Sequence, residues 1–166
     1  MLSSSTPSVA KDMKIRTMLL ILALAFIAVA ATFASESNLG VWKLREAKSR
    51  FSATAAKNRT VVYEAEGNNM KVTVDATDAR GQSTHSTWTG KFDGKDYPVI
   101  GDPASTARSC KKIDDHTTEF TERKDGKITI RGRVVVTADG KSLTVTGTGT
   151  DANGRKVKYT AVYDKE

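Results

Sequence analysis

The sequence has little cysteine and little histidine: its 166 residues include one cysteine, Cys110, and two histidines, His85 and His116. A single cysteine cannot close an internal disulfide, so the folded chain must be stabilised by an apolar core. We expect Cys110 to be buried and unreactive, because no base stands near it in the sequence. Zinc sites need three or four converging ligands, and neither histidine has such neighbours. We therefore expect no metal and no cofactor.

Other signatures of enzymes and of nucleic-acid-binding proteins are also missing. There is no nucleophile elbow and no glycine-rich phosphate loop. Lys and Arg number 26 against 19 Asp and Glu, a net charge of +7, but the basic residues are spread along the chain beside acidic ones rather than gathered in runs. Dispersed charge of this kind is typical of a solvated surface and not of a nucleic-acid interface. We expect neither catalysis nor nucleic-acid binding.

Only one long hydrophobic run is present, over residues 18–34, and Lys11, Lys14 and Arg16 precede it. A basic flank, an apolar stretch and small residues at Ala31 or Ala34 form the layout of a signal peptide. We therefore assign residues 1–34 to a leader, with Met13 as a possible true start. Residues 35–166 then form a single domain.

The alternative is a permanent anchor, because the uncharged stretch over residues 17–35 approaches the length of a membrane-spanning helix. Cleavage is favoured because the run ends in small residues and no basic cluster follows it. The sequence thus predicts an exported protein, periplasmic or secreted, which contacts a membrane only if the leader is not cleaved.

After the leader, turn-forming residues recur at short intervals, such as Asp93-Gly94, Asp125-Gly126 and Asp139-Gly140. Asp-Gly and Asn-Gly pairs favour tight hairpins, since Gly, Asn and Asp tolerate positive φ. The segments between them are rich in β-branched and aromatic residues and read as strands. Apolar and polar residues alternate within them, so each strand has one buried face. Arg131 and Arg133 fall on the outer face by this rule.

The pattern predicts an all-β fold: an antiparallel up-and-down meander that closes into a barrel of about eight to ten strands. The only helical candidate is the Ala- and Lys-rich segment over residues 46–57, which would form a short lid after the first strand. Gly147 and Gly149 leave space on one side of the penultimate strand. That space indicates a bend, or room for a ligand.

Both ends of the domain resemble known barrels. Gly40-Val41-Trp42-Lys43-Leu44 resembles the Gly-x-Trp opening strand of lipocalins and fatty-acid-binding proteins, where the Trp closes one end of the barrel. Val162-Tyr163-Asp164-Lys165 is similar to the closing strand of the fatty-acid-binding branch. The chain also looks like the many secreted bacterial proteins described only as lipocalin-like. The resemblance implies a calycin-type barrel that binds a small molecule.

One departure bears on the ligand. The fatty-acid-binding proteins hold the ligand carboxylate with an Arg-x-Tyr on the last strand, and the matching positions here are Ala161-Val162-Tyr163. The arginine is absent, and an unpaired buried carboxylate would cost several kcal/mol. Fatty acid is therefore not the expected ligand.

Two functions remain open. The first is a non-catalytic carrier of a small apolar or amphipathic molecule held inside the barrel. The residues expected to face the cavity, or to form the core if the barrel is filled, are Trp42, Tyr63, Val74, Trp88, Phe92, Ile130, Tyr159 and Tyr163. The second is an interaction module with a filled barrel that binds an envelope component or a protein through a loop over residues 93–102, with Asp93, Lys95 and exposed Tyr97 at the contact. A hollow and a filled barrel share one alternation pattern, so the sequence does not separate them.

Overall fold

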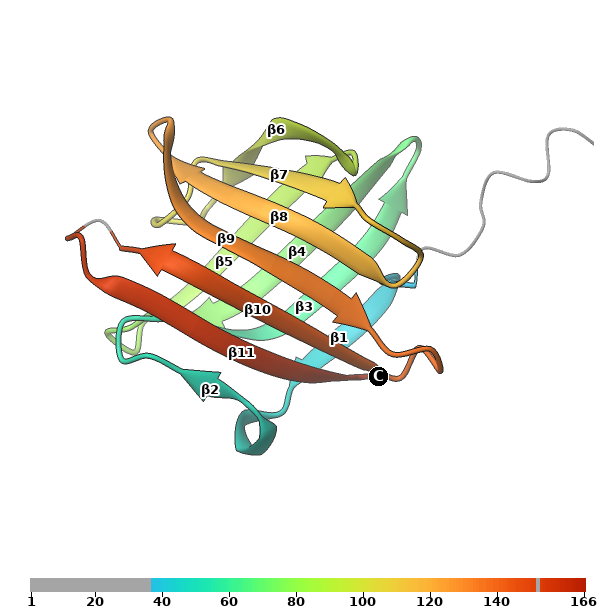
Figure 1. Ribbon diagram of the computed structural model, residues 1–166, viewed down its shortest axis with the longest axis horizontal. Helices are drawn as coiled ribbons and strands as arrows, with labels where there is room; N and C mark the ends of the chain where they lie inside the picture. Colours follow the sequence, from blue (N-terminus) through green and yellow to red (C-terminus); the bar gives the residue numbers. More distant parts are fainter. Residues whose placement is uncertain (1–36, 152) are drawn as a thin grey trace, which may run out of the picture. The chain divides into compact units, whose positions relative to one another are not determined.

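The computed structural model describes residues 37–151 and 153–166, and these residues form an antiparallel sheet of eleven strands (Figure 1). In chain order the elements are β1 (Gly40–Leu44), the one-turn 3-10 helix η1 (Glu46–Lys48), β2 (Arg50–Phe51), β3 (Lys57–Glu66), β4 (Asn69–Thr77), β5 (Ser83–Gly90), β6 (Asp93–Ile100), β7 (Ala107–Lys112), β8 (Thr117–Lys124), β9 (Lys127–Val136), β10 (Ser142–Thr150) and β11 (Lys156–Lys165). The predicted all-β meander is confirmed. The strand number exceeds the predicted range because β2, of two residues, adds a short strand beside β11.

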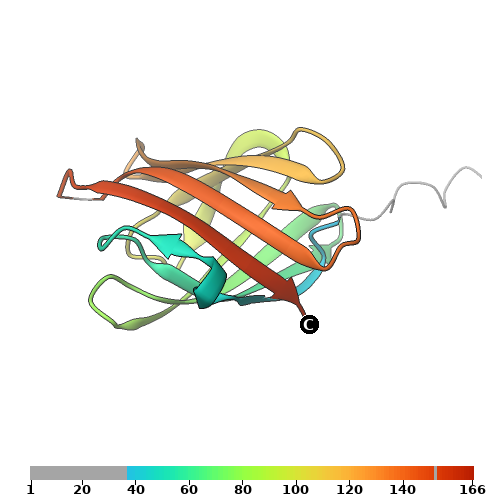
Figure 2. The same cartoon turned by 60° about the horizontal axis from the view of Figure 1, so that its bottom comes forward.

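The sheet closes on itself because β1 pairs with strands on both sides. Trp42 faces Val61 of β3 across one ladder and Lys165 of β11 across the other. Figure 2 shows β11 lying across the barrel beside β2. Closure removes the long unpaired edges that an open sheet would expose. Strands β5 and β6 are joined by two residue pairs, Thr87 with Ile100 and Trp88 with Val99.

Alternation places one side of each strand inside the barrel, as predicted. Val72 of β4, for example, lies between Tyr63 of β3 and Trp88 of β5, and all three side chains are buried. Arg131 and Arg133 are exposed on the outside of β9. Residues on the inner face supply most of the buried core, which comprises Trp42, Ala55, Val61, Tyr63, Met70, Val72, Val74, Ala76, Trp88, Cys110, Phe120, Ile130, Val134, Val136, Leu143, Val157, Ala161 and Tyr163.

Aspartates build many of the turns. Asp78, Asp93, Asp102, Asp114, Asp139 and Asp151 each accept a hydrogen bond from the backbone N–H two residues further on. This bond imitates a backbone turn and explains why aspartate recurs there. The predicted Asp125-Gly126 hairpin has positive φ at both residues, 50° and 77°, as the favoured two-residue turn requires.

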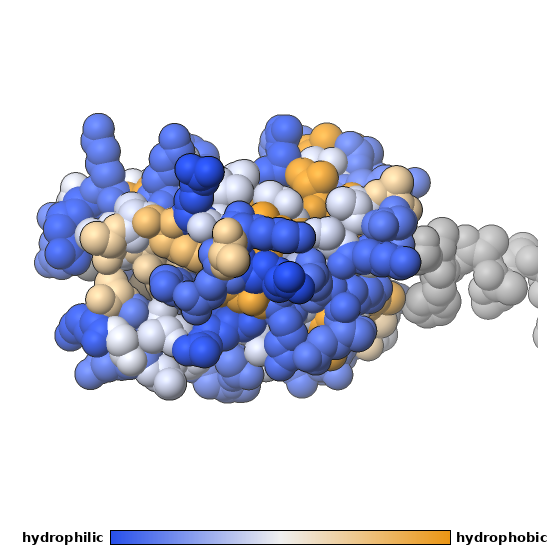
Figure 3. Space-filling model, turned by 90° about the horizontal axis from the view of Figure 1, so that it is seen from below, coloured by the Kyte–Doolittle hydropathy of each residue, from blue (hydrophilic) through white to orange (hydrophobic). Residues whose placement is uncertain are grey.

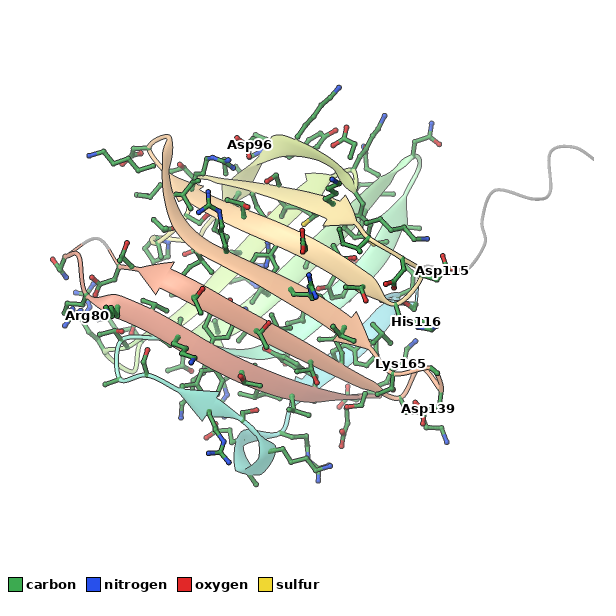
Figure 4. The ribbon with its side chains drawn as sticks, in the orientation of Figure 1. Arg80, Asp96, Asp115, His116, Asp139 and Lys165 are labelled. Carbon is green, nitrogen blue, oxygen red and sulfur yellow. The ribbon has the colours of Figure 1, made fainter. Side chains whose placement is uncertain are left out.

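The turns gather at two opposite ends of the barrel. The open end carries the turns over residues 78–82, 101–106 and 125–126 and the described turn residues 151 and 153–155, and the packed end carries the turns over 67–68, 113–116 and 137–141. Figure 4 places Arg80 at the open end and Asp115, His116, Asp139 and Lys165 at the packed end. Trp42 belongs to the packed end, since its strand partner is Lys165.

The predicted helix over residues 46–57 is largely wrong. Only Glu46–Lys48 is helical, and Arg50–Phe51 is strand β2. The reason lies in two serines that bond to β11: Ser49 Oγ accepts from the N–H of Val162 at 2.9 Å, and Ser52 Oγ accepts from the N–H of Lys158 at 3.1 Å. These side-chain bonds hold the segment extended along the barrel, because serine competes with helical hydrogen bonding.

The predicted interaction loop over residues 93–102 is also wrong in its structure. Asp93–Ile100 is strand β6, paired with β7 and bulged between Asp93 and Asp96. Tyr97 is half-buried: its ring meets that of Trp88 edge-on with centroids 6.0 Å apart, and its hydroxyl donates to Asp93 Oδ2 at 3.1 Å. Asp93 and Lys95 are exposed. Tyr97 and Val99 lie two positions apart on the same face of β6, and both side chains pack against the core, whereas Pro98 between them is exposed.

The predicted leader, residues 1–34, lies outside the described residues. Within residues 37–151 and 153–166, no helix has the length and apolar character needed to cross a membrane.

Candidate ligand cavity

The barrel is hollow toward its open end. A cavity of about 710 Å³ lies inside the sheet and reaches the turns of that end, where Ala79, Pro103 and Asn153 line it. Its volume falls within the range of about 300–1,000 Å³ typical of small-molecule sites. The apolar side chains of its wall include Phe51, Val72, Val74, Ala76, Trp88, Val99, Ile130, Val157, Tyr159, Ala161 and Tyr163.

The eight residues predicted from sequence for a cavity or core fall into two sets. Val74, Trp88, Ile130, Tyr159 and Tyr163 line the cavity. The other three are not in the cavity wall: Trp42 and Tyr63 are buried in the core, and Phe92 is half-buried, with its ring parallel to that of Trp88 at a centroid distance of 6.2 Å.

Trp42 marks the packed end of the barrel. Its side chain is 0% exposed, and its indole Nε1 donates to the carbonyl oxygen of Asn38 at 2.7 Å. The ammonium of Lys165 stands 5.2 Å from the ring centre. With its polar atom satisfied and its ring enclosed, Trp42 fills this end of the barrel interior.

A row of glycines and aromatics crosses the wall between the two ends. Phe120 of β8, Gly132 of β9, Gly147 of β10 and Tyr159 of β11 are successive cross-strand partners. A Cβ on Gly147 would lie 2.3 Å from Tyr159 Cζ, and one on Gly132 would lie 2.4 Å from Phe120 Cζ. Each ring therefore lies over its neighbouring glycine. The space that the sequence left open at Gly147 is filled by Tyr159.

An ion pair between Arg108 of β7 and Glu122 of β8 lies in the cavity wall, away from the turns of the mouth. The two residues are direct cross-strand partners, and Arg108 Nη2 lies 3.3 Å from Glu122 Oε1. Their side chains are 15% and 21% exposed. Both face inward. Cys110 lies two positions from Arg108 and Phe120 two positions from Glu122, so each shares a strand face with its neighbour, and both are buried in the core. A low-dielectric wall strengthens their mutual attraction.

Several contacts fix Arg108. Its guanidinium lies over the ring of Phe120 at 4.4 Å, and its backbone carbonyl accepts from Trp88 Nε1 at 2.9 Å. Among the described residues, no acceptor lies within hydrogen-bonding distance of its buried Nε atom. Unpartnered buried donors are rare in proteins, so Arg108 retains hydrogen-bonding capacity that its protein neighbours do not use.

Burial and charge act in opposite directions on this pair. Burial raises the pKa of Glu122 above its usual range, and the Arg108 guanidinium lowers it. Burial alone would lower the pKa of Arg108, but Glu122 and, to a smaller extent, Cys110 raise it above its usual value. Burial also raises the pKa of Tyr63 to about 12 and that of Cys110 to about 11. Around the pair, therefore, the tyrosine and the thiol are neutral at physiological pH.

The remaining charged residues of the cavity lie at its mouth and balance one another. Arg80 pairs with Asp78 at 3.8 Å, and Arg155 pairs with Asp151 at 2.7 Å. Lys124 and Asp102 complete the charged lining. Together with Arg108 and Glu122 this gives four basic and four acidic residues. The cavity is therefore formally neutral, although the chain carries +7.

Arg108 and Glu122 are not among the site residues predicted from the sequence, because the inward faces of their two strands were not assigned. The signal was present: Phe120 is the one large apolar residue of its strand, and Glu122 stands two positions beyond it, on the same face. A hairpin centred on Asp115 then pairs Arg108 with Glu122, as the register shows.

The other candidate reactive groups lie outside the cavity wall. His85 is exposed, with Nδ1 2.7 Å from Asp75 Oδ1, and His116 is exposed beside the turn at Asp114. Cys110 is buried, as the sequence predicted. Within the described ranges, His, Cys, Asp and Glu side chains form no group that could hold a metal ion. Figure 3 shows one face of the barrel, largely hydrophilic with smaller apolar patches between charged side chains.

Comparison with known families finds no matching family model, and comparison with curated proteins finds no match. Two solved structures are similar in form. One is a redesigned β-barrel, mFAP1, bound to DFHBI, with a TM-score of 0.44, 11% identity and coverage of 78% of this chain and 96% of the other. The second is EF1p2_mFAP2b bound to DFHBI, with a TM-score of 0.44, 10% identity and coverage of 80% and 97%. Similarity at this level assigns no ligand to this chain.

Proposed function

We propose that this protein is an exported, non-catalytic carrier that holds a small amphipathic molecule in the open half of its barrel. The observation that carries the proposal is the cavity of about 710 Å³, which has apolar walls and a single inward ion pair between Arg108 and Glu122. Apolar walls with a few convergent polar groups are the usual design of a small-molecule site. Export, to the periplasm or the medium, is supported by the signal-like pattern of residues 1–34.

The alternative function, contact through an exposed loop around Tyr97, has less support. The residue that would anchor a partner packs against Trp88 and bonds to Asp93. Its segment is a strand of the barrel wall.

A cavity-filling variant tests the carrier function. Ser86 lies on the inner face of β5 opposite Val74 and lines the cavity, whereas Ser83 lies on the same strand and is exposed. Nile red, an uncharged apolar dye that fluoresces when it leaves water, is titrated into the purified chain and into both variants. We expect saturable binding that Ser86→Trp weakens at least about tenfold and Ser83→Trp leaves unchanged. Absence of saturable binding, or equal binding by both variants, would refute the carrier function.

A further inference from the structure

The charges of the cavity indicate which class of ligand it accepts. Among the ion pairs of the described cavity wall, only Arg108–Glu122 has both side chains largely buried, at 15% and 21% exposed, whereas Arg80 and Arg155 are 82% and 59% exposed. A cation that stood alone at this depth would attract a carboxylate. Here the cation already has one, supplied by the neighbouring strand. The mouth adds no net charge, because its basic and acidic residues are equal in number.

An anionic ligand would therefore meet an unfavourable site. To reach the Arg108 guanidinium it must lie beside the Glu122 carboxylate, and two like charges at close range in a partly dry wall repel each other strongly. A cationic ligand meets the reverse problem with Arg108. An uncharged head group avoids both penalties, and only its hydrogen bonds have to be matched.

The pair has unused hydrogen-bonding capacity for such a head group. The Nη2–Oε1 distance of 3.3 Å exceeds the distance of about 2.7–2.9 Å usual for charge-assisted hydrogen bonds. Arg108 Nε has no acceptor among the described residues. Arginine offers five N–H donors and an ionised carboxylate only acceptors. A head group that contains both a carbonyl and an N–H can therefore bond to Arg108 with one and to Glu122 with the other.

We propose that the cavity selects uncharged amphipathic molecules whose polar head both accepts and donates hydrogen bonds, such as primary amides, and that Glu122 excludes carboxylates. This inference rests on the proposed carrier function and specifies the substrate class of the same site. The apolar tail lies along Val72, Val74, Ile130 and Val157 in the remainder of the cavity. Glu122 is here a specificity-determining residue, and its removal converts the site into one for anions.

Competition between two ligands that differ only in the head group tests the proposal. Decanamide and decanoate are each titrated against bound Nile red at about pH 8, where the acid is ionised. We expect decanamide to displace the dye at a concentration at least about tenfold lower than decanoate does. Glu122→Gln, which is nearly isosteric, should tighten decanoate binding at least about tenfold by freeing Arg108.

Glu119→Gln is the matched control, because Glu119 belongs to the same strand but pairs with Arg133 on the outside of the barrel. It should leave both ligands unchanged. If Glu122→Gln does not fold, Glu122→Ala replaces it and, because it also frees Arg108, should likewise tighten decanoate binding at least about tenfold.

The outcomes separate the two proposals. Loss of all Nile red binding refutes the carrier function itself. Dye binding that is sensitive to Ser86→Trp, together with equal displacement by decanoate and decanamide, retains the carrier but overturns the assignment of an uncharged ligand. A preference for the amide that persists unchanged in the Glu122 variants overturns the role of Glu122.

Discussion

The packed end and the open end of this barrel follow the same alternation of inward and outward residues but differ in the volume of the inward ones. At the packed end the inner positions hold Trp42, Leu143 and Val136, which are almost fully buried. Toward the open end, inner positions hold small residues such as Ala76 and Ser86, and the cavity lies there. Side-chain volume, and not the binary pattern, therefore decides which half of a barrel is core and which half is site.

The two ends also differ in how fully their buried polar atoms are hydrogen-bonded. At the packed end the buried polar atom, Nε1 of Trp42, is satisfied by a backbone carbonyl at 2.7 Å. In the open half, Arg108 and Glu122 meet at 3.3 Å, and Arg108 retains a donor without a protein acceptor. Full satisfaction favours a rigid core. Incomplete satisfaction in a hollow half favours binding.

The largest expected effect comes from breaking the packed end. Trp42→Ala removes a fully buried ring and its hydrogen bond, and should lower the free energy of unfolding by about 3–5 kcal/mol. Urea unfolding followed by circular dichroism measures it. Trp42→Phe should lower the free energy of unfolding clearly less, because phenylalanine keeps most of the buried side-chain volume. A loss below about 1 kcal/mol for Trp42→Ala would show that this end is not the better packed half.

The second effect comes from breaking the ion pair. Arg108→Met leaves the Glu122 carboxylate unpaired in the wall and should cost about 2–3 kcal/mol at neutral pH, less than a fully enclosed pair because the carboxylate is 21% exposed to the cavity. The double variant Arg108→Met with Glu122→Leu should recover most of this loss. Equal losses in the single and double variants would mean that the pair itself does not account for the effect.

This loss should depend on pH. Burial already raises the pKa of Glu122 above its ordinary 4.5, and the variant removes the lowering effect of Arg108, so the pKa rises further. The folded state then binds more protons than the unfolded state above about pH 4.5, so stability falls as pH rises. The free energy of unfolding of Arg108→Met should therefore be closest to that of the natural chain near pH 4, and the difference should grow toward pH 7. A pH-independent difference in unfolding free energy would contradict this.

A smaller effect is expected in the row of glycines and aromatic residues that crosses strands β8 to β11. In Gly147→Ala the new Cβ would stand 2.3 Å from Tyr159 Cζ, and displacing the ring should cost about 1–3 kcal/mol. The test is a double-mutant cycle by chemical unfolding. In a Tyr159→Ala background the same substitution should cost much less. An equal cost in both backgrounds would assign the strain to the backbone rather than to the ring.

The smallest effect is expected outside the barrel. Arg133 pairs with Glu119, but the two side chains are 53% and 47% exposed, so Arg133→Ala should change the free energy of unfolding by less than about 1 kcal/mol. Thermal unfolding at two salt concentrations measures it. A loss as large as that of Arg108→Met would remove the contrast between inner and outer ion pairs on which the site assignment depends.

Much of the barrel could be predicted from sequence, because the alternation of apolar and polar residues indicates strands and their faces, and Asp-Gly pairs indicate the hairpin turns between them. The faces of Val72, Ile130 and Tyr163 follow from period-two patterning. The helix over residues 46–57 was mispredicted because Ser49 and Ser52 bond to a strand more than 100 residues away, which no local pattern contains. The β6 segment was misread as a loop because Asp-Gly and Pro98 interrupt its alternation.

The site was less predictable than the fold. Whether Ser86 and Ala76 border a cavity depends on how side chains from all strands fill the interior, which a single strand does not reveal. The Arg108–Glu122 pair was accessible in principle, since hairpin register places the two residues opposite each other. Its importance, however, depends on the cavity beside it.

Native mass spectrometry of the chain as its producing cells make it tests the central claim most directly. The protein is purified without denaturation or lipid extraction, alongside Ser86→Trp prepared in the same way. The account predicts an added mass of small-molecule size that is lost on unfolding and is absent from Ser86→Trp. A bare protein mass for the natural chain, together with Nile red binding that Ser86→Trp does not weaken, would contradict it.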